Sequence, residues 1–346
     1  DADVLLVRSV TPVNEVLLKG SSVKFVGTTT IGLDHIDTDY LQQQGIGFCS
    51  APGCNAGAVV EYVLSVLSVL TEQYGFGLLE KTMGIVGYGE IGSRLAQVLR
   101  EMGMQVKAND PPRQAAGENS LTTLSEVMAC DIVSIHVPLT DTGPWPTREL
   151  INAEQIQKLQ RSQILINTSR GDVMDEEALL SKLSGDLHPT VVLDVFRHEP
   201  EISKSLAERC QFATPHIAGY SLEGKHNGTE MVYRQFCRYA GLPVRYSAAD
   251  FAPEPALKKM VYSSGVDVDY GFNTAVRAAY DVRTDDANLR KTLFLSAEQR
   301  SLAFDQLRKN YRVRRGFNTL AIEAGDCHPS LIARLTAAGF RLNETL

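Results

Sequence analysis

The feature that most constrains the fold is a regular alternation of short, β-rich apolar runs with helical patterns between residues 82 and 214. A helix placed between two strands returns the chain so that consecutive strands run parallel and helices cover both faces of the sheet. The predicted strands span residues 83–87, 105–109, 132–137, 163–168, 190–195 and 211–214. The predicted crossover helices lie near residues 90–101, 122–129, 153–159, 175–183 and 202–208. This pattern predicts an α/β domain built on a doubly wound parallel sheet.

Two further units flank this domain. A weaker β/α pattern in residues 1–50 predicts a smaller, flavodoxin-like α/β unit, with strands near residues 4–7, 23–26 and 46–48. The apolar stretch 56–70 predicts a helix buried between domains, and a helical stretch at 222–239 is expected to lead the chain back to the first unit. Past Gly241-Leu242-Pro243 the pattern becomes irregular α+β. We therefore expect three domains: 1–57 (completed by about 220–243), 58–219 and 244–346.

The composition is that of a globular protein with unevenly distributed charge. The chain has 346 residues, of which 44% are hydrophobic, and its formal net charge is -7. Residues 1–240 carry 19 basic and 29 acidic side chains, whereas residues 241–346 carry 15 and 12. An acidic body argues against nucleic-acid binding, which needs clustered Lys and Arg. The most apolar stretch, residues 59–70, contains Glu61 and falls short of the ~18 apolar residues of a membrane span, so we expect no contact with a membrane.

The six cysteines are scattered without a CxxC pair, and no charged-then-apolar leader opens the chain. We therefore expect reduced thiols and a cytoplasmic location. Cys49 and Cys54 lack the second pair that would complete a zinc site, so no metal is predicted. The chain begins at Asp1, without Met, inside a segment that reads as structured, and we expect some N-terminal sequence to be missing.

A glycine motif, GxGxxG, follows the first strand of the central domain and opens a helix. Gly87 allows the tight turn, Gly89 lets the backbone approach a pyrophosphate, and Gly92 permits close packing of the helix. The pyrophosphate would lie against the first helical residues, Glu90 and Ile91. Glycine-rich turns are common, so the motif gains weight from its position between a strand and a helix. It predicts a Rossmann domain that binds a dinucleotide.

Asp110 ends the second strand, 18 residues after Gly92, close to the ~20 expected for the acidic residue that binds the adenosine ribose. A carboxylate there would repel a 2′-phosphate, so NAD is favoured over NADP. Arg113 leaves an alternative open, because it could pair with a 2′-phosphate, stack on adenine or simply lie in solvent.

Three chemically active side chains follow successive strands of the predicted sheet. Arg170 follows the fourth strand, Glu199 the fifth and His216 the sixth. Ligands of open α/β sheets bind beyond the carboxyl ends of the strands, so we expect these side chains to meet in one crevice. An arginine can hold a carboxylate in bidentate fashion, a histidine can take a hydroxyl proton, and a carboxylate can orient that histidine. The set predicts hydride transfer from a 2-hydroxy acid.

At these residues the sequence resembles the D-isomer-specific 2-hydroxyacid dehydrogenases. The resemblance is carried by Ile166-Asn167-Thr168-Ser169-Arg170-Gly171, Leu193-Asp194-Val195-Phe196 with Glu199-Pro200, and Thr214-Pro215-His216-Ile217-Ala218-Gly219. It implies that Arg170 and Glu199 are catalytic and that His216 is the proton donor. It further implies substrate contacts at Ser9, Thr30 and Tyr220. NAD contacts are implied at Asp110, Asp194 and Gly219, and Thr168 and Ser169 lie in the segment that passes the cofactor.

The tail resembles that of one branch of this family, through Tyr280-Asp281-Val282-Arg283 and residues 304–311. This resemblance implies oxidation of 4-phospho-D-erythronate by NAD, in pyridoxal 5′-phosphate biosynthesis, and a homodimer formed through residues 244–346. Other members of the family oxidise 3-phosphoglycerate or glycerate, and some are NAD-sensing regulators without turnover, so both remain alternatives. Candidate ligands of the substrate phosphate are Arg8, Ser9 and Thr30, joined by Arg312, Arg314 or Arg315 from the basic tail or from a partner subunit.

Three features depart from the family pattern. Phe196-Arg197-His198-Glu199 replaces the usual aromatic-Glu-Gly-Glu run, and Val137 follows His136 where a threonine is common. We expect the first strand and helix of the family's substrate domain to be missing before Asp1. We expect the first two departures to alter loop mobility and the grip on the cofactor.

Overall fold

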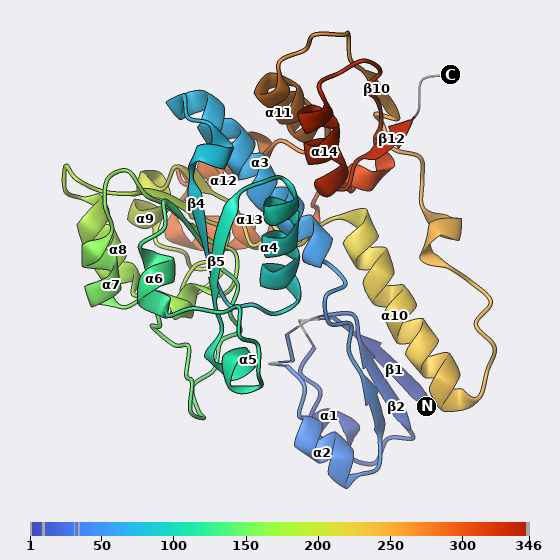
Figure 1. The fold of residues 1–346 in the computed structure, drawn as a ribbon. Coiled ribbons are helices and arrows are strands. Elements are labelled where there is room, and N and C mark those ends of the chain that lie inside the picture. Colours follow the sequence, from blue (N-terminus) through green and yellow to red (C-terminus); the bar gives the residue numbers. More distant parts are fainter. Residues whose placement is uncertain (1, 9–10, 31, 34, 344–346) are drawn as a thin grey trace. The chain divides into compact units, whose positions relative to one another are not determined.

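The computed structural model describes the chain except for residues 1, 9–10, 31, 34 and 344–346 (Figure 1). The chain forms two compact units. Unit 1 consists of residues up to 58 together with Tyr220–Glu254, and unit 2 consists of Val59–Gly219 together with residues from 255 onward. Within the described residues, no helix is both long enough and apolar enough to span a membrane.

Unit 1 is built on a three-stranded parallel sheet in the order β1-β2-β3. The strands are β1 (Val4–Val7), β2 (Phe25–Thr28) and β3 (Gly47–Cys49), and the short helices are α1 (Glu15–Leu18), α2 (Thr38–Gln43) and η3 (Ala248–Phe251). The long helix α10 (Leu222–Ala240) ends at Gly241, whose φ of 66° needs the left-handed conformation that glycine tolerates. Phe236 of α10 packs edge-on against Phe25 of β2, so the helix covers the sheet.

Unit 2 contains a six-stranded parallel sheet in the order β5-β4-β6-β7-β8-β9. Its strands are β4 (Thr82–Val86), β5 (Gln105–Asn109), β6 (Ile132–Ile135), β7 (Ile164–Asn167), β8 (Thr190–Leu193) and β9 (Phe212–Ala213). β6 and β7 are buried along their whole length, which explains why their sequences are mostly apolar. The chain runs outward from β4 to β5 and then returns to β6, so the order reverses at β4. The predicted doubly wound fold is confirmed.

The helices of unit 2 follow the strands in sequence. They are α3 (Ala56–Tyr74), which begins in unit 1, α4 (Glu90–Glu101), α5 (Pro111–Ala115), α6 (Leu124–Met128), α7 (Ala153–Lys158), α8 (Glu176–Leu183) and α9 (Lys204–Arg209), with 3-10 turns η1 (Leu78–Glu80) and η2 (Gly171–Val173). α8 packs beside both α7 and α9 (Figure 1). α6 begins two residues later than predicted because Thr123 and Glu126 form a capping box.

The C-terminal segment adds a small sheet and four helices to unit 2. The strands of this sheet are parallel and are β10 (Lys259–Val261), β11 (Ala321–Glu323) and β12 (Arg341–Asn343). The 3-10 turn η4 (Phe317–Thr319) precedes β11. Helix α11 (Val268–Ala279) packs on α14 (Pro329–Ala337). Between them lie α12 (Val282–Thr292) and α13 (Ala297–Lys309). Leu289, Leu293 and Phe304 from these two helices belong to the same apolar core as Leu193 of β8. Helices α12 and α13 therefore share a core with the large sheet, whereas the sequence predicted a separate domain from residue 244.

Candidate active site

The glycine turn at the end of β4 has the shape that a dinucleotide needs. Gly87 has a φ of 93°, and a Cβ on Gly92 would lie 1.9 Å from the carbonyl oxygen of Gly87. A Cβ on Gly89, the N-cap of α4, would meet nothing within 4 Å, and no side chain caps the helix there. Gly92 therefore lets the helix approach the strand, while Gly89 leaves space in front of the α4 amides. The first residues of α4, Glu90 and Ile91, lie at this open end.

Asp110 lies beside this turn, as the sequence predicted. One carboxylate oxygen accepts a hydrogen bond from the Tyr88 amide at 2.8 Å, and the other accepts from the Arg113 amide at 3.0 Å. Asp110 thereby caps α5 and is held next to the glycine turn. The residues present fit a dinucleotide, with free helix amides for the pyrophosphate and an acidic side chain at the end of the neighbouring strand.

The loop after β7 is shaped by Asn167, a residue that the sequence analysis did not single out. Its side-chain oxygen accepts from the Ser169 amide at 2.9 Å and from the Ser169 hydroxyl at 2.8 Å, and its amide nitrogen donates to the Arg170 carbonyl at 3.1 Å. Thr168 and Ser169 are buried, while Arg170 is partly exposed at the end of this loop. An asparagine at a strand end before a short polar loop was the available signal.

His136 follows β6 and is buried behind this loop. Its ring nitrogens lie 2.9 Å from the Ser134 hydroxyl and 3.2 Å from the Thr168 hydroxyl. Burial lowers the pKa of His136 to about 3, so the ring is neutral at physiological pH. Its role is to hold Thr168 in place.

His216 and Glu199 form the predicted pair. Nδ1 of His216 lies 2.7 Å from Oε2 of Glu199, and the other carboxylate oxygen accepts from the Phe196 amide at 2.9 Å. Burial alone would raise the pKa of Glu199, but the hydrogen bond and charge of His216 and the Phe196 amide hold the pKa below its ordinary value. The Glu199 side chain is 17% exposed and the His216 side chain 30%, so the ring still reaches solvent. His216 has a φ of 56°, an uncommon backbone conformation for a residue other than glycine.

Asp194 holds the backbone on which His216 stands. Its carboxylate accepts hydrogen bonds from the amides of Ile217 and Ala218, each at 2.8 Å, and from the Thr214 hydroxyl at 2.6 Å. Burial raises the pKa of Asp194 to about 6, while the charge of His216 and these hydrogen bonds oppose the rise. Asp194 therefore fixes the loop that also carries Gly219, and its predicted contact with NAD stays a prediction.

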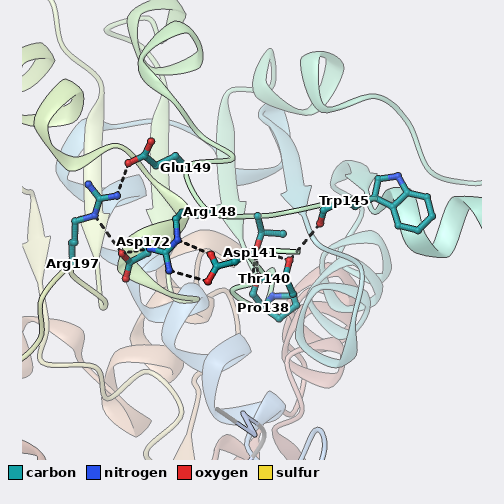
Figure 2. A network of polar contacts seen from close by, with 9 residues as sticks. Pro138, Thr140, Asp141, Trp145, Arg148, Glu149, Asp172 and Arg197 are labelled. Carbon is teal, nitrogen blue, oxygen red and sulfur yellow. Dashed lines mark hydrogen bonds and ion pairs between the residues drawn. The ribbon is translucent and has the colours of Figure 1, made fainter. Parts of the chain in front are cut away.

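A chain of ion pairs supports the loop that ends at Glu199 (Figure 2). Arg197 binds Glu149 at 2.5 Å and Asp172 at 3.4 Å, and Asp172 also binds Arg148 at 2.7 Å. The Arg197 amide donates to the buried carboxylate of Glu176 at 2.6 Å. The unusual loop is evident in the sequence, but these partners are not, because they are distant from it along the chain. The network ties the loop after β8 to the loop after β7.

Unit 1 holds the predicted substrate contacts that the structure describes. Ser9 lies outside the described residues. The Thr30 hydroxyl is 2.7 Å from that of Thr28, and Arg8 is exposed. The Lys225 ammonium lies 5.1 Å from the ring centre of Tyr220, and burial and the charge of Arg8 lower the pKa of Lys225. Lys225 and Arg8 are thus close enough to repel each other. No role for Lys225 was evident from the sequence.

The expectation that Arg314 binds the substrate phosphate is wrong. Its side chain is 0% exposed, and Nη2 lies 3.3 Å from a carboxylate oxygen of Glu61. An ionised side chain that is buried and paired in this way has no path to a ligand in solvent. Arg312 is paired with Asp285 at 3.6 Å. Among the described residues no group of three or more His, Cys, Asp or Glu side chains is placed to hold a metal ion.

Together, the doubly wound sheet, the glycine turn and the histidine–carboxylate pair define a dinucleotide-dependent dehydrogenase of 2-hydroxy acids. A family model, D-isomer specific 2-hydroxyacid dehydrogenase, NAD binding domain, matches residues 69–218, and a domain of unknown function (DUF3410) matches residues 251–339. The chain belongs to the D-isomer-specific 2-hydroxyacid dehydrogenase family and is an NAD-dependent dehydrogenase. A group of relatives matches it over nearly its whole length.

Those relatives are curated as erythronate-4-phosphate dehydrogenases. The chain is 57% identical to the one from Hahella chejuensis and 51% identical to the one from Marinobacter nauticus, in each case over 99% of this chain and 90% of the relative. Among solved structures, D-lactate dehydrogenase from Aquifex aeolicus, complexed with NAD and lactic acid, is 27% identical with a TM-score of 0.54 and covers 69% of this chain and 84% of its own. The predicted fold class and the predicted cofactor, NAD, are confirmed.

Proposed function

We propose that this chain oxidises 4-phospho-D-erythronate at C2 to 2-oxo-3-hydroxy-4-phosphobutanoate, with NAD as hydride acceptor, in the biosynthesis of pyridoxal 5′-phosphate. The observation that carries the reaction type is the 2.7 Å hydrogen bond between His216 and Glu199. The pair lies at the ends of β8 and β9, in the same sheet as the glycine turn. The choice of substrate is supported by curated relatives that are named for it and match along nearly the whole chain.

His216 acts as the base that takes the proton of the C2 hydroxyl. A carboxylate can only accept, so Nδ1 of His216 carries the hydrogen that it donates to Glu199, and Nε2 is left with its lone pair. As Nε2 gains the hydroxyl proton, the ring becomes an imidazolium. The lowered pKa of Glu199 keeps the carboxylate ionised, so it stabilises that charge.

Arg170 is assigned to the substrate carboxylate. It stands at the end of β7 on a loop fixed by Asn167, and one of its guanidinium nitrogens donates to the Ser169 carbonyl at 2.8 Å. A planar guanidinium can hold a carboxylate through two parallel hydrogen bonds and draw charge from the adjacent C2 oxygen. This orients C2 and favours the developing carbonyl.

NAD supplies the acceptor for the hydride that leaves C2. Gly87, Gly89 and Gly92, with the amides of Glu90 and Ile91, would hold its pyrophosphate, and Asp110 would bind its adenosine ribose. Thr168, Ser169, Asp194 and Gly219 complete the proposed set of cofactor contacts.

The substrate phosphate is assigned to residues of unit 1. Arg8, Thr30 and Ser9 remain the proposed ligands, with Tyr220 as a further substrate contact. Lys225 supports this assignment, because its ammonium lies near Tyr220, and its pKa is lowered by burial and, to a smaller extent, by the charge of Arg8. A bound dianion would offset the repulsion between these two neighbouring cations.

A comparison of substrates tests the proposed function. NADH formation is measured with 4-phospho-D-erythronate, D-erythronate and 3-phosphoglycerate under the same conditions. We expect kcat/KM for the phosphorylated four-carbon acid to exceed that for erythronate by about 10- to 100-fold or more, since hydrogen bonds to a charged group carry that much binding energy. A higher kcat/KM for 3-phosphoglycerate would show that the substrate is another acid. NAD binding without turnover of any of the three acids would indicate a regulator.

We also propose a homodimer and a cytoplasmic location. Two large apolar side chains of the C-terminal segment, Phe294 and Val313, are 88% and 66% exposed, which a second copy would cover. All six cysteines are free thiols, as a reducing compartment favours. Light scattering after gel filtration would test the dimer, and a monomer at micromolar concentration would contradict it.

A further inference from the structure

The short stretch that carries His216 is held at both ends by the C-terminal segment of the chain. Three residues before His216, the Ala213 amide donates to the Asp286 carboxylate of α12 at 2.8 Å. Two residues after it, the Ala218 carbonyl accepts from Nη1 of Arg314 at 3.1 Å. We propose that Arg314 and Asp286 are positioning residues for His216, an inference that rests on the catalytic role proposed for that histidine.

Asp286 accepts a hydrogen bond from the edge strand β9. β9 is the last strand of the sheet and pairs only with β8, so its outer amides have no strand to bind. α12 lies against β9, and Asp286 takes the Ala213 amide with one oxygen while the other binds Arg290 at 2.8 Å. Arg290 in turn donates to the Cys210 carbonyl at 2.8 Å. The strand that delivers the chain to His216 is therefore fixed by one helix of the C-terminal segment.

Arg314 is placed so that its planar guanidinium binds two partners at once. Nη1 donates to the Ala218 carbonyl, while Nη2 lies 3.3 Å from a carboxylate oxygen of Glu61 on α3. The other oxygen of Glu61 accepts from the Phe317 amide at 2.8 Å. A buried guanidinium is tolerated only when it is paired, and its flat fork fits two acceptors in a way that a lysine ammonium does not.

The aromatic surface under Arg314 is itself fixed. The guanidinium carbon lies 3.7 Å from the ring centre of Tyr280, within the range of a cation–π contact. The Tyr280 hydroxyl donates to Asp285 at 2.8 Å, and its carbonyl accepts from the Ser65 hydroxyl at 2.8 Å. Arg314 therefore has little freedom to move away from Ala218.

These contacts complement those of Asp194. The Ala218 amide donates to Asp194, and the Ala218 carbonyl accepts from Arg314, so both polar atoms of this residue are fixed from opposite directions. Misplacing a reacting group by about 1 Å can cost on the order of 100-fold in rate. Arg314 and Asp286 both lie within residues 251–339, the region that matches the domain of unknown function, and the inference gives that region a task in catalysis.

The test compares variants of the full chain: Arg314→Met, Arg314→Lys and Asp286→Asn. The matched control is Arg277→Met, because Arg277 of α11 also pairs with a glutamate of α3, Glu72, and has no hydrogen bond to residues 213–218 among its described contacts. We measure kcat, KM, the Kd of NAD, the melting temperature, and the primary isotope effect on kcat with substrate deuterated at C2.

Loss of Arg314 should slow hydride transfer itself. We expect Arg314→Met to lower kcat by about 10- to 100-fold and to raise the isotope effect, with the Kd of NAD changed less than about threefold. Arg314→Lys keeps the charge opposite Glu61 and should recover part of kcat. Asp286→Asn should lower kcat in the same direction, whereas Arg277→Met should lower only the melting temperature.

The inference is overturned if folded Arg314→Met has the kcat and isotope effect of the wild type, or if Arg277→Met loses as much kcat as Arg314→Met does. If Arg314→Met does not fold, Arg314→Lys and Asp286→Asn decide in the same way. His216→Gln separates the two proposals. An active His216→Gln would refute the proposed function together with this inference, whereas an inactive His216→Gln beside a wild-type-like Arg314→Met would refute the positioning role alone.

Discussion

Glu199 has a different task for each of its oxygens. Oε2 accepts from His216 at 2.7 Å, and Oε1 accepts from the Phe196 amide at 2.9 Å. The second contact fixes the carboxylate against its own loop, so the histidine meets it in a single orientation. An arrangement of this kind supports proton transfer without a large rearrangement of the site.

Behind this loop, Glu176 couples folding stability to pH. Burial raises the pKa of Glu176 to about 7, although the amide and charge of Arg197 oppose the rise. A carboxyl group with a folded-state pKa above its unfolded value binds more protons when folded. The free energy of unfolding should therefore fall as pH rises from about 4.5 to 7. A substitution that removes the carboxylate charge of Glu176 should restore it.

We predict that Glu176→Gln raises the free energy of unfolding at pH 8 by about 2–3 kcal/mol. The glutamine oxygen can still accept from the Arg197 amide, so the loop contact is kept. Urea unfolding at pH 5 and pH 8 measures the effect. Glu177→Gln, an exposed neighbour in the same helix turn, is the control. Equal pH dependence in wild type and Glu176→Gln would contradict the prediction.

Site residues were predictable where they follow an apolar run. Arg170, Glu199 and His216 stand at strand ends, and strand ends can be read from the sequence because buried strands are continuous apolar segments. Glu176 was missed because its contact with the Arg197 amide depends on how two segments that are distant in sequence fold beside one another. Asn167 bonds only within its own loop, and its position at a strand end was a usable signal. Arg314 was misassigned because an arginine in a basic tail carries no sign of its burial.

At the scale of elements, the strand–turn–helix unit from β4 to α4 separates packing from binding. A Cβ on Gly92 would lie 1.9 Å from the Gly87 carbonyl oxygen, whereas a Cβ on Gly89 would meet nothing within 4 Å. The two glycines are only three residues apart, yet one is needed by the fold and the other leaves room for a ligand.

We predict that Gly92→Ala lowers the melting temperature and loses NAD binding, because α4 must move away from β4. Gly89→Ala should keep the melting temperature and weaken NAD binding by about tenfold or more, since a methyl group would occupy the space in front of the helix amides. Calorimetric titration and thermal unfolding measure both effects. A stable Gly92→Ala would contradict the packing role of Gly92, and Gly89→Ala with wild-type NAD affinity would show that the turn does not bind the cofactor.

Element boundaries were less predictable than element identity. The six predicted strands and five predicted crossover helices are all present, but α3 extends to Tyr74 and β6 ends at Ile135 rather than at residue 137. Caps set such limits, for example the capping box of Thr123 and Glu126 that starts α6 at Leu124.

At the scale of the whole molecule, the C-terminal segment is part of the body that carries the cofactor site. Phe304 of α13 is fully buried in the core that includes β8, whereas Leu302 of the same helix is 64% exposed. Amphipathic helices reveal from sequence that one face is buried, but not which core they join. The sequence predicted a separate third domain because its pattern becomes irregular α+β past residue 243.

We predict that Phe304→Ala lowers the free energy of unfolding by about 3–5 kcal/mol within one cooperative transition. Leu302→Ala should change it by less than about 0.5 kcal/mol. Chemical unfolding followed together by circular dichroism and NAD binding measures both. If Phe304→Ala instead melted a C-terminal segment separately, with NAD binding intact at the wild-type midpoint, the shared core would be refuted.

The central claim is that this chain moves a hydride from C2 of a phosphorylated 2-hydroxy acid to NAD, with His216 as the base. The most direct measurement uses 4-phospho-D-erythronate that carries deuterium at C2, followed by mass spectrometry of the dinucleotide after a single turnover. The account predicts reduced NAD that contains one deuterium, and no such product with His216→Gln. Deuterium that remains in the acid or passes to solvent, while NAD stays bound and unreduced, would contradict the account.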